Sequence, residues 1–221
     1  MSDITLYNYF RSSTSYRARI ALHYKNIPFE YKPVHLVNKD GEQNSAEYLK
    51  LNPAGEVPTL VHAGKVIAQS FAIIEYLDEV YNSPALFPKD AYHRAKVRQF
   101  CENINSFIHP LGNLKVQQYL EKKHGYTTED KNAWVAHWTA KGLTATEKIL
   151  SEFSGKYCFG DEITAADLFL VPQVFSSERF GVDLKPYSKI RAVNENCLQI
   201  DAFKKAHPLR QIDTPEENRI K

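Results

Sequence analysis

The chain has 221 residues, of which 43% are hydrophobic and 24% charged, and its 28 basic and 26 acidic side chains leave a formal net charge of +2. A mean hydropathy of -0.45 and the lack of an apolar run of roughly 18 residues argue against a membrane span, and the N-terminus lacks the layout of a signal peptide, so we expect a cytoplasmic protein. The small charge, with no Lys/Arg block interleaved with aromatic residues, argues against a nucleic-acid partner.

The N-terminal part of the chain predicts alternating strands and helices. Strands are expected at 4–9, 29–34, 59–61 and 66–68, and helices at 16–25, 46–51 and 71–77. Alternating or short apolar runs indicate the strands, and apolar residues at helical spacing indicate the helices. Ser70 is expected to cap the third helix. The order β-α-β-α-β-β-α is that of a thioredoxin-like fold, which we place at residues 1–81.

A turn-rich stretch with two prolines, residues 82–90, is expected to link this domain to an all-helical domain at 91–221. Strand signals nearly vanish after the linker, and helical patterns cover 93–120, 131–153, 165–180 and 188–206. Thr164-x-x-Asp167 is a capping box that begins the third of these helices. The polar stretch 211–221 is expected to be a loosely held tail. The predicted fold class is thus an α+β thioredoxin-like domain followed by an all-α domain.

The run Ser12-Ser13-Thr14-Ser15 lies between the first strand and the first helix. Hydroxyl groups, backbone N–H groups and the positive end of a helix dipole together form a site for an anion. Redox proteins of this fold carry a C-x-x-C dithiol here, and its absence means that any thiol chemistry needs an external thiol. Plain helix capping is the alternative interpretation.

Two further places in the first domain suit a bound peptide. A cis bond before Pro58 would expose the backbone N–H and C=O of Val57 for pairing, although an ordinary proline at the start of a strand explains the same residues. Gln69-Ser70 lies between a strand and a helix, where a hydroxyl and backbone N–H groups can bind a carboxylate or simply cap the helix.

Arg11 and Arg179 are candidates for binding a carboxylate, because a guanidinium group matches its geometry. Arg11 lies beside the hydroxyl run and is otherwise a surface charge, and Arg179 is otherwise a cation favourably placed at a helix C-terminus. His109-Pro110 interrupts a long helix and either turns an imidazole toward a cleft or faces solvent.

The cysteines and histidines indicate no metal site. The three cysteines, Cys101, Cys158 and Cys197, are widely spaced without a C-x-x-C pair, and we expect reduced thiols. The eight histidines show neither H-E-x-x-H nor H-x₃₋₅-H spacing.

These signals fall in one order along the chain. The motif R-S-S-T-S-Y-R-A-R-I-A-L at 11–22 is followed by further motifs at 51–53, 57–60, 69–77, 160–167, 170–174, 178–180, 182–184 and 210–215. In this order the chain resembles the zeta-class glutathione transferases, the family of maleylacetoacetate isomerase, nearly from end to end.

The resemblance implies a homodimer that binds glutathione against the first domain. It places the glutathione sulfur beside Ser12, Ser13, Thr14, Ser15, Tyr16 and Arg17, the cysteinyl backbone at Val57 and the γ-glutamyl group at Gln69 and Ser70. Further contacts match Gln43, His109, Asn113, Leu114 and Lys115. The zeta motif usually reads S-S-C, and Thr14 replaces its cysteine here.

The family's chemistry implies a glutathione-dependent cis–trans isomerase acting on a dicarboxylic substrate. Ser12 or Ser13 and the helix N-terminus would stabilise the thiolate, and Arg11 and Arg179 would bind the carboxylates and the developing enolate. Three interpretations stay open: maleylacetoacetate isomerase of tyrosine and phenylalanine catabolism with a side activity on α-haloacids, maleylpyruvate isomerase of gentisate-type degradation, and a non-catalytic binding protein of the same fold.

Overall fold

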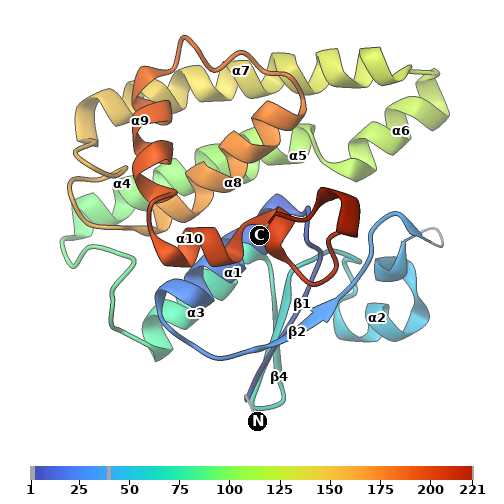
Figure 1. The fold of residues 1–221 in the computed structure, drawn as a ribbon, viewed down its shortest axis with the longest axis horizontal. Coiled ribbons are helices and arrows are strands. Elements are labelled where there is room, and N and C mark those ends of the chain that lie inside the picture. The colour runs from blue at the N-terminus through green and yellow to red at the C-terminus, as the bar shows by residue number, and fades with distance from the viewer. Residues whose placement is uncertain (1–2, 39–40, 221) are drawn as a thin grey trace. The chain divides into compact units, whose positions relative to one another are not determined.

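The computed structural model describes residues 3–38 and 41–220, which fall into two compact units (Figure 1). The first unit combines Met1–Ala85 with Gln199–Lys221, and the second consists of Leu86–Leu198. The units therefore divide the chain differently from the expected domain boundaries, because the last segment groups with the N-terminal part.

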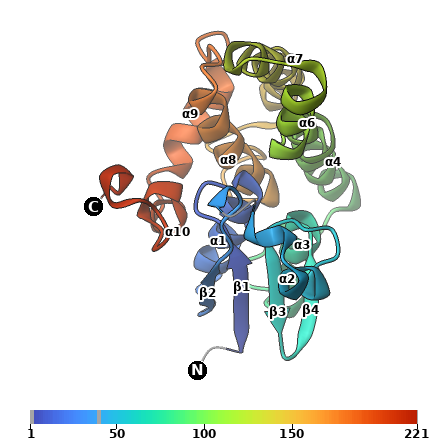
Figure 2. The same cartoon turned by 90° about the vertical axis from the view of Figure 1, so that its right-hand side faces the viewer.

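The first unit contains a four-stranded mixed sheet (Figure 2). The strands are β1 (Ile4–Asn8), β2 (Glu30–Pro33), β3 (Thr59–His62) and β4 (Lys65–Ala68), in the order β2-β1-β3-β4. β1 pairs parallel with β2 and antiparallel with β3, and β3 pairs antiparallel with β4. Leu6 of the central β1 lies opposite Leu60, and both side chains are fully buried. Alternate residues of β1 thus supply the core.

The helices α1 (Ser13–Tyr24) and α2 (Ala46–Leu51) connect strands of this sheet, and α3 (Ser70–Val80) follows β4. α1 joins the parallel strands β1 and β2, as a parallel pair requires a crossover connection. It packs against α3 and against α10 (Asp201–Ala206). The order of strands and helices confirms the predicted thioredoxin-like fold, with α1 beginning three residues earlier than expected.

The tail after α10 is held in place by hydrogen bonds, so the expected loosely held tail is wrong. The Gln211 side-chain amide donates to the carbonyls of Lys205 (2.8 Å) and His207 (2.7 Å). The Thr214 hydroxyl donates to the Pro208 carbonyl at 2.7 Å. Gln211 and Thr214 are both buried. These polar residues satisfy backbone carbonyls in the last turn of α10 and directly after it, which composition alone does not reveal.

The second unit is helical. Its helices are α4 (Ala91–Glu102), α5 (His109–Leu111), α6 (Leu114–His124), α7 (Thr128–Phe153), α8 (Ala165–Arg179) and α9 (Ser188–Cys197), with a π-helix at Asn103–Ile108. Two predicted helices are therefore divided. The pattern at 93–120 covers α4, the π-helix, α5 and α6, and the pattern at 188–206 covers α9 and α10. Among the residues that the structure describes, no helix combines the length and apolar character needed to cross a membrane.

The capping box at the start of α8 is confirmed. The fully buried Asp167 carboxylate accepts hydrogen bonds from the backbone N–H groups of Thr164 (2.8 Å) and Cys158 (2.8 Å). Burial raises the pKa of Asp167, and these hydrogen bonds act in the opposite direction. The box therefore joins the start of α8 to the loop that precedes it.

Gly142 allows α7 to approach the π-helix closely. A Cβ atom at this position would lie 2.2 Å from Cγ1 of Ile108, and the Asn103 side-chain amide donates to the Gly142 carbonyl at 3.3 Å. A longer side chain would force the two segments apart.

We therefore expect Gly142→Ala to lower the free energy of unfolding by about 1–3 kcal/mol through overpacking. Helix propensity alone predicts the opposite, a gain of up to about 1 kcal/mol. Urea denaturation measures the difference. The control is Ala145→Gly on the exposed face of α7, which should cost only about 1 kcal/mol from propensity. A stabilised Gly142→Ala protein would contradict the close approach.

Candidate active site

The hydroxyl run forms the first turn of α1. Ser12 is the N-cap, and its Oγ accepts a hydrogen bond from the Ser15 backbone N–H at 3.2 Å. Ser12, Ser13 and Thr14 are half-buried, whereas Ser15, Tyr16 and Arg17 are buried beneath them. The capping interpretation and the anion-site interpretation are thus compatible, because the cap uses the Ser12 oxygen while the N-terminal end of the helix stays accessible.

The hydroxyl groups of this turn are linked in one direction. Thr14 Oγ1 donates to the Val57 carbonyl at 2.9 Å and lies 2.8 Å from Ser12 Oγ. A carbonyl oxygen accepts only, so the single Thr14 hydroxyl proton points to Val57 and Ser12 donates to Thr14. We call this chain from Ser12 through Thr14 to Val57 the hydroxyl relay. It joins the N-terminus of α1 to the segment that enters β3.

The segment around Val57 is held by the motif Leu51-Asn52-Pro53 and by Tyr48. The Glu56 carbonyl accepts from the Tyr48 hydroxyl (2.7 Å) and the Asn52 amide (2.8 Å). The same two side chains reach Thr59 Oγ1, at 2.9 and 3.1 Å. Burial raises the pKa of Tyr48, while its bonds to Thr59 and Asn52 act the other way. Asn52 belongs to the motif at 51–53, and these bonds show that it holds the segment that enters β3. The Val57–Pro58 bond, for which the sequence left both interpretations open, is cis.

The Gln69-Ser70 corner differs from the prediction that Ser70 caps α3. Gln69 occupies the N-cap position with a φ of 72°, and Ser70 is the first residue of the helix. The buried Ser70 hydroxyl accepts from Arg17 Nη1 at 3.2 Å, and the Gln69 amide donates to Glu56 Oε2 at 3.2 Å. The Arg17 guanidinium therefore adds a positive charge at the N-terminal end of α3, where the helix dipole already favours an anion.

Gln43 offers a buried acceptor in the loop before α2. Its amide nitrogen donates to the Leu36 carbonyl at 3.4 Å, and no donor among the described residues reaches its Oε1 atom. The neighbouring Gly41 has a φ of 89°, and a Cβ there would lie 2.4 Å from the Gln43 amide nitrogen. A buried carbonyl oxygen of this kind usually pairs with a donor, so it suits a ligand N–H group.

Arg11 lies on the turn that leads from β1 to the hydroxyl relay. The Ser12 backbone N–H closes this turn on the Tyr9 carbonyl at 3.1 Å. The Arg11 side chain is exposed, with its Cζ atom 5.9 Å from the Phe10 ring centroid. The guanidinium group is thus accessible next to Ser12.

The remaining predicted residues belong to the second unit. His109 follows the π-helix, and its Nε2 atom lies 3.5 Å from the side-chain nitrogen of Asn113. Asn113 caps α6 through the Lys115 backbone N–H at 3.0 Å, with Leu114 between them. Arg179 is exposed at the end of α8, and its Cζ atom lies 4.5 Å from the Phe180 ring centroid. The unit therefore brings His109, Asn113, Leu114 and Lys115 together.

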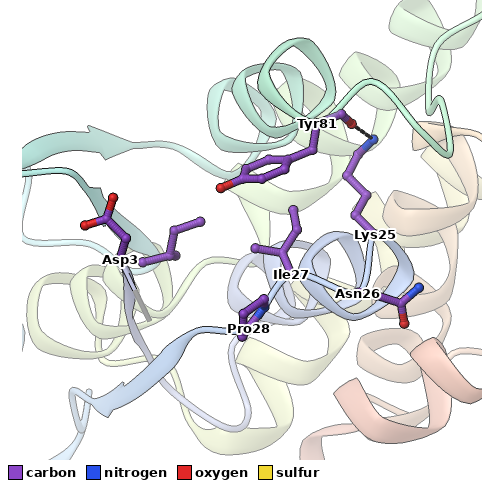
Figure 3. Close-up of a pocket in the computed structure, with 7 residues that line it drawn as sticks. Asp3, Lys25, Asn26, Ile27, Pro28 and Tyr81 are labelled. Carbon is purple, nitrogen blue, oxygen red and sulfur yellow. Dashed lines mark hydrogen bonds between the residues drawn. The ribbon is translucent and has the colours of Figure 1, made fainter. Parts of the chain in front are cut away.

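One pocket of the first unit is lined by other residues (Figure 3). It has a volume of about 310 Å³ at the N-terminal end of β1 and the C-terminal end of α1. Lys25 beside it donates to the carbonyls of Tyr81 (2.7 Å) and Pro84 (2.6 Å) and to Asp78 (2.7 Å). Its lining consists of Asp3, Ile4, Lys25, Asn26, Ile27, Pro28 and Tyr81. None of the predicted site residues is among them.

The protein's own thiols are unsuited to act as nucleophiles. Cys101, Cys158 and Cys197 are buried free cysteines. Burial and the nearby Asp167 carboxylate raise the pKa of Cys158 and of Cys197, which keeps both as neutral thiols. Within residues 3–38 and 41–220, no cluster of His, Cys, Asp or Glu side chains could hold a metal ion.

Comparison with known proteins gives consistent matches. Residues 2–79 match the family model described as glutathione S-transferase, N-terminal domain. A probable maleylacetoacetate isomerase 2 of Drosophila melanogaster is 45% identical over 218 residues, which are 98% of this chain and 93% of the relative. A holo structure of a maleylpyruvate isomerase, described as a bacterial glutathione S-transferase of the zeta class, is 44% identical with a TM-score of 0.93, covering 96% of this chain and 100% of the other.

A further solved structure contains a ligand. It is a maleylacetoacetate isomerase from Anaeromyxobacter dehalogenans with glutathione bound in its active site. It is 38% identical to this chain with a TM-score of 0.86, covering 96% of this chain and 98% of the other.

The hydroxyl relay can be tested by changing its central residue. Thr14→Val keeps the shape of the side chain but removes the donor to Val57 and the acceptor for Ser12. We expect the free energy of unfolding to fall by about 1 kcal/mol, because two polar groups at a half-buried position lose their partner. Thr14→Ser retains the hydroxyl and should stay within about 0.5 kcal/mol of the wild type. Equal losses in both variants, measured by urea denaturation, would contradict the relay.

Proposed function

Because this chain belongs to the zeta-class glutathione transferases, we propose that it is a glutathione-dependent cis–trans isomerase that converts maleylacetoacetate to fumarylacetoacetate. The observation that carries the proposal is the hydroxyl turn at the N-terminus of α1, where Ser12, Ser13 and Thr14 are accessible and no protein thiol is present. Such a turn stabilises a thiolate that comes from elsewhere. This reaction belongs to tyrosine and phenylalanine catabolism.

The residues of the first unit fit glutathione. The buried Oε1 acceptor of Gln43 suits an N–H group, and the Gln69-Ser70 corner with Arg17 suits the carboxylate of the γ-glutamyl end. The backbone of Val57 would pair with the cysteinyl part. In the second unit, His109, Asn113, Leu114 and Lys115 would supply the further contacts that the family resemblance implies.

When bound, glutathione supplies a thiolate that adds to the cis double bond and leaves after rotation about the resulting single bond. The chain lowers the pKa of that thiol through the dipole of α1 and the hydroxyl groups of Ser12 and Ser13, since both favour the charged form. In the hydroxyl relay, the Ser12 hydroxyl donates its hydrogen bond to Thr14, so it must rotate before it can donate to sulfur. Ser13→Ala should therefore mainly lower turnover.

Arg11 and Arg179 are proposed to bind the two carboxylates of the substrate. Both guanidinium groups are exposed and rest near an aromatic ring, Phe10 and Phe180 respectively. A guanidinium group forms two parallel hydrogen bonds with a carboxylate and also stabilises negative charge that develops on an adjacent enolate oxygen.

Maleylpyruvate is the second candidate substrate, and Thr14 is the observation that favours it. Maleylpyruvate isomerases share an R-S-x-T-S turn with threonine where the usual zeta motif has cysteine, and this chain reads R-S-S-T-S at 11–15. The two substrates differ in the chain between their keto and carboxylate groups. A ratio of kcat/KM values for the two therefore distinguishes the two isomerase functions.

The homodimer, the cytoplasmic location and the side activity on α-haloacids are part of the same proposal and are supported by the family resemblance. The competing function is a protein that binds glutathione without turnover. The accessible hydroxyl turn beside Arg11 favours an enzyme over such a binding protein.

The decisive experiment mixes purified protein, glutathione and each cis substrate, and follows the loss of the cis absorbance. We expect a rate that depends on glutathione and that is higher for maleylacetoacetate. Glutathione binding by calorimetry without any loss of absorbance would support the binding-protein function instead. A higher kcat/KM for maleylpyruvate would replace the first substrate with the second.

Arg179→Ala and Arg11→Ala should lower kcat/KM for the dicarboxylic substrate, each by roughly tenfold or more, because each removes a charge-assisted pair. Affinity for glutathione should change little. The matched control is Arg191→Ala, which removes an exposed guanidinium from α9. If the two variants and the control gave the same kinetics, the assignment of Arg11 and Arg179 would be wrong.

A further inference from the structure

The two residues that precede Arg11 are held between a buried cation and an anion. Arg19 Nη2 donates to the Phe10 carbonyl at 2.9 Å, and Nη1 donates to the Tyr9 carbonyl at 3.2 Å. On the other side of the same residue, the Phe10 backbone N–H donates to Asp213 Oδ2 at 2.9 Å. Both backbone groups of Phe10 thus make charge-assisted hydrogen bonds, which are about twice as strong as neutral ones.

Arg19 is a rigid support for this arrangement. Its side chain is fully buried in α1, and it also donates to Asn8 Oδ1 (2.9 Å) and to the Ala206 carbonyl (3.1 Å). Burial lowers the pKa of Arg19, while Tyr31, Asp213 and Tyr16 act in the opposite direction. The guanidinium group stays charged, as arginine does in proteins.

Asp213 reaches Phe10 from a segment 203 residues further along the chain. Its second oxygen accepts from the Tyr31 hydroxyl of β2 at 2.5 Å. The residues on either side of it are fixed as well, because Arg219 Nη2 donates to the carbonyls of Ile212 (3.0 Å) and Thr214 (2.8 Å). Asp213 is therefore held in place by hydrogen bonds of its own carboxylate and of the residues on either side of it.

These contacts control a turn that ends at the proposed site. Tyr9 accepts the Ser12 backbone N–H at 3.1 Å, so the turn runs from Tyr9 through Phe10 and Arg11 to Ser12. Ser12 begins the hydroxyl relay and caps α1. A shift of the Phe10 peptide group would therefore move both the Arg11 guanidinium and the N-terminus of α1.

We propose that Asp213 is a positioning residue for catalysis, which holds the turn from Tyr9 to Ser12 in place through the Phe10 N–H group. This inference rests on the proposed function, because the turn matters only if the relay and the helix N-terminus stabilise a thiolate. The C-terminal segment thus sets the electrostatic environment of the bound sulfur without touching it. Displacements of about 1 Å at such a site reduce rates by up to about a hundredfold.

The test compares Asp213→Ala, Asp213→Asn and Tyr31→Phe with the wild type. Asp213→Ala removes the acceptor of Phe10, Asp213→Asn keeps an oxygen acceptor without the charge, and Tyr31→Phe leaves the Phe10 bond intact but frees the second oxygen. Asp201→Asn, at the exposed start of α10, is the matched control for the change in charge. The main readout is the pKa of the bound glutathione thiol, titrated by the ultraviolet absorbance of the thiolate, together with kcat, KM and melting temperature.

We expect Asp213→Ala to raise the bound-thiol pKa by about one unit and to lower kcat roughly tenfold, with a smaller effect on KM. Asp213→Asn should change the thiol pKa and kcat in the same direction but less than Asp213→Ala does. Tyr31→Phe should raise the thiol pKa by a smaller amount, and Asp201→Asn should match the wild type. A purely structural role predicts instead a lower melting temperature with an unchanged thiol pKa.

The outcomes separate this proposal from the proposed function. If Asp213→Ala and the wild type share the same thiol pKa and kcat, the positioning role is wrong while the isomerase function stands. If the wild type lowers the thiol pKa but isomerises neither substrate, the isomerase function is wrong and the comparison of pKa values still tests Asp213. If Asp213→Ala does not fold, unchanged thiol pKa values in both Asp213→Asn and Tyr31→Phe overturn the proposal.

Discussion

The buried guanidinium of Arg19 is the interaction on which the first unit depends. Burying a cation away from solvent costs free energy unless its N–H groups find hydrogen-bond acceptors. The Arg19 guanidinium donates to Asn8, Tyr9, Phe10 and Ala206. These four acceptors come from the end of β1, from the turn that follows it and from α10. One side chain therefore ties the end of the strand, the turn after it and the C-terminal helix to α1. The hydroxyl relay begins directly after this point.

The helix cap at the candidate site could be predicted from the sequence because it depends on residues that are close in the chain. The Ser and Thr cluster had to cap a helix after the strand that ends at Asn8, since hydroxyl oxygens satisfy N–H groups of a first turn. The capping box of Thr164 and Asp167 follows from a spacing of three residues in the same way. The order of strands and helices in the thioredoxin-like part follows from apolar periodicity.

The parts that could not be predicted depend on contacts between residues that are far apart in the sequence, or on the local conformation of the backbone. A periodic pattern shows neither that the Ser70 hydroxyl accepts from Arg17 nor that Gln69, with a φ of 72°, is the N-cap of α3. Within 93–120, His109-Pro110 indicates an interruption, but the pattern shows neither the π-helix before it nor the break within 188–206, because a π-helix and a short turn preserve apolar residues at similar spacing. Asp213 looks like an ordinary charge in a polar tail until its partner Phe10 is known.

The return of residues 199–221 to the first unit has a consequence for biosynthesis. During translation the strands and helices of the N-terminal part emerge first and begin to fold as a domain. The acceptor at Ala206 and the carboxylate of Asp213 emerge only after the whole of Leu86–Leu198 has been made. The nascent N-terminal part therefore carries the Arg19 cation without its full set of partners until then. A segment that is made after Leu86–Leu198 thus completes a unit whose strands were made before it.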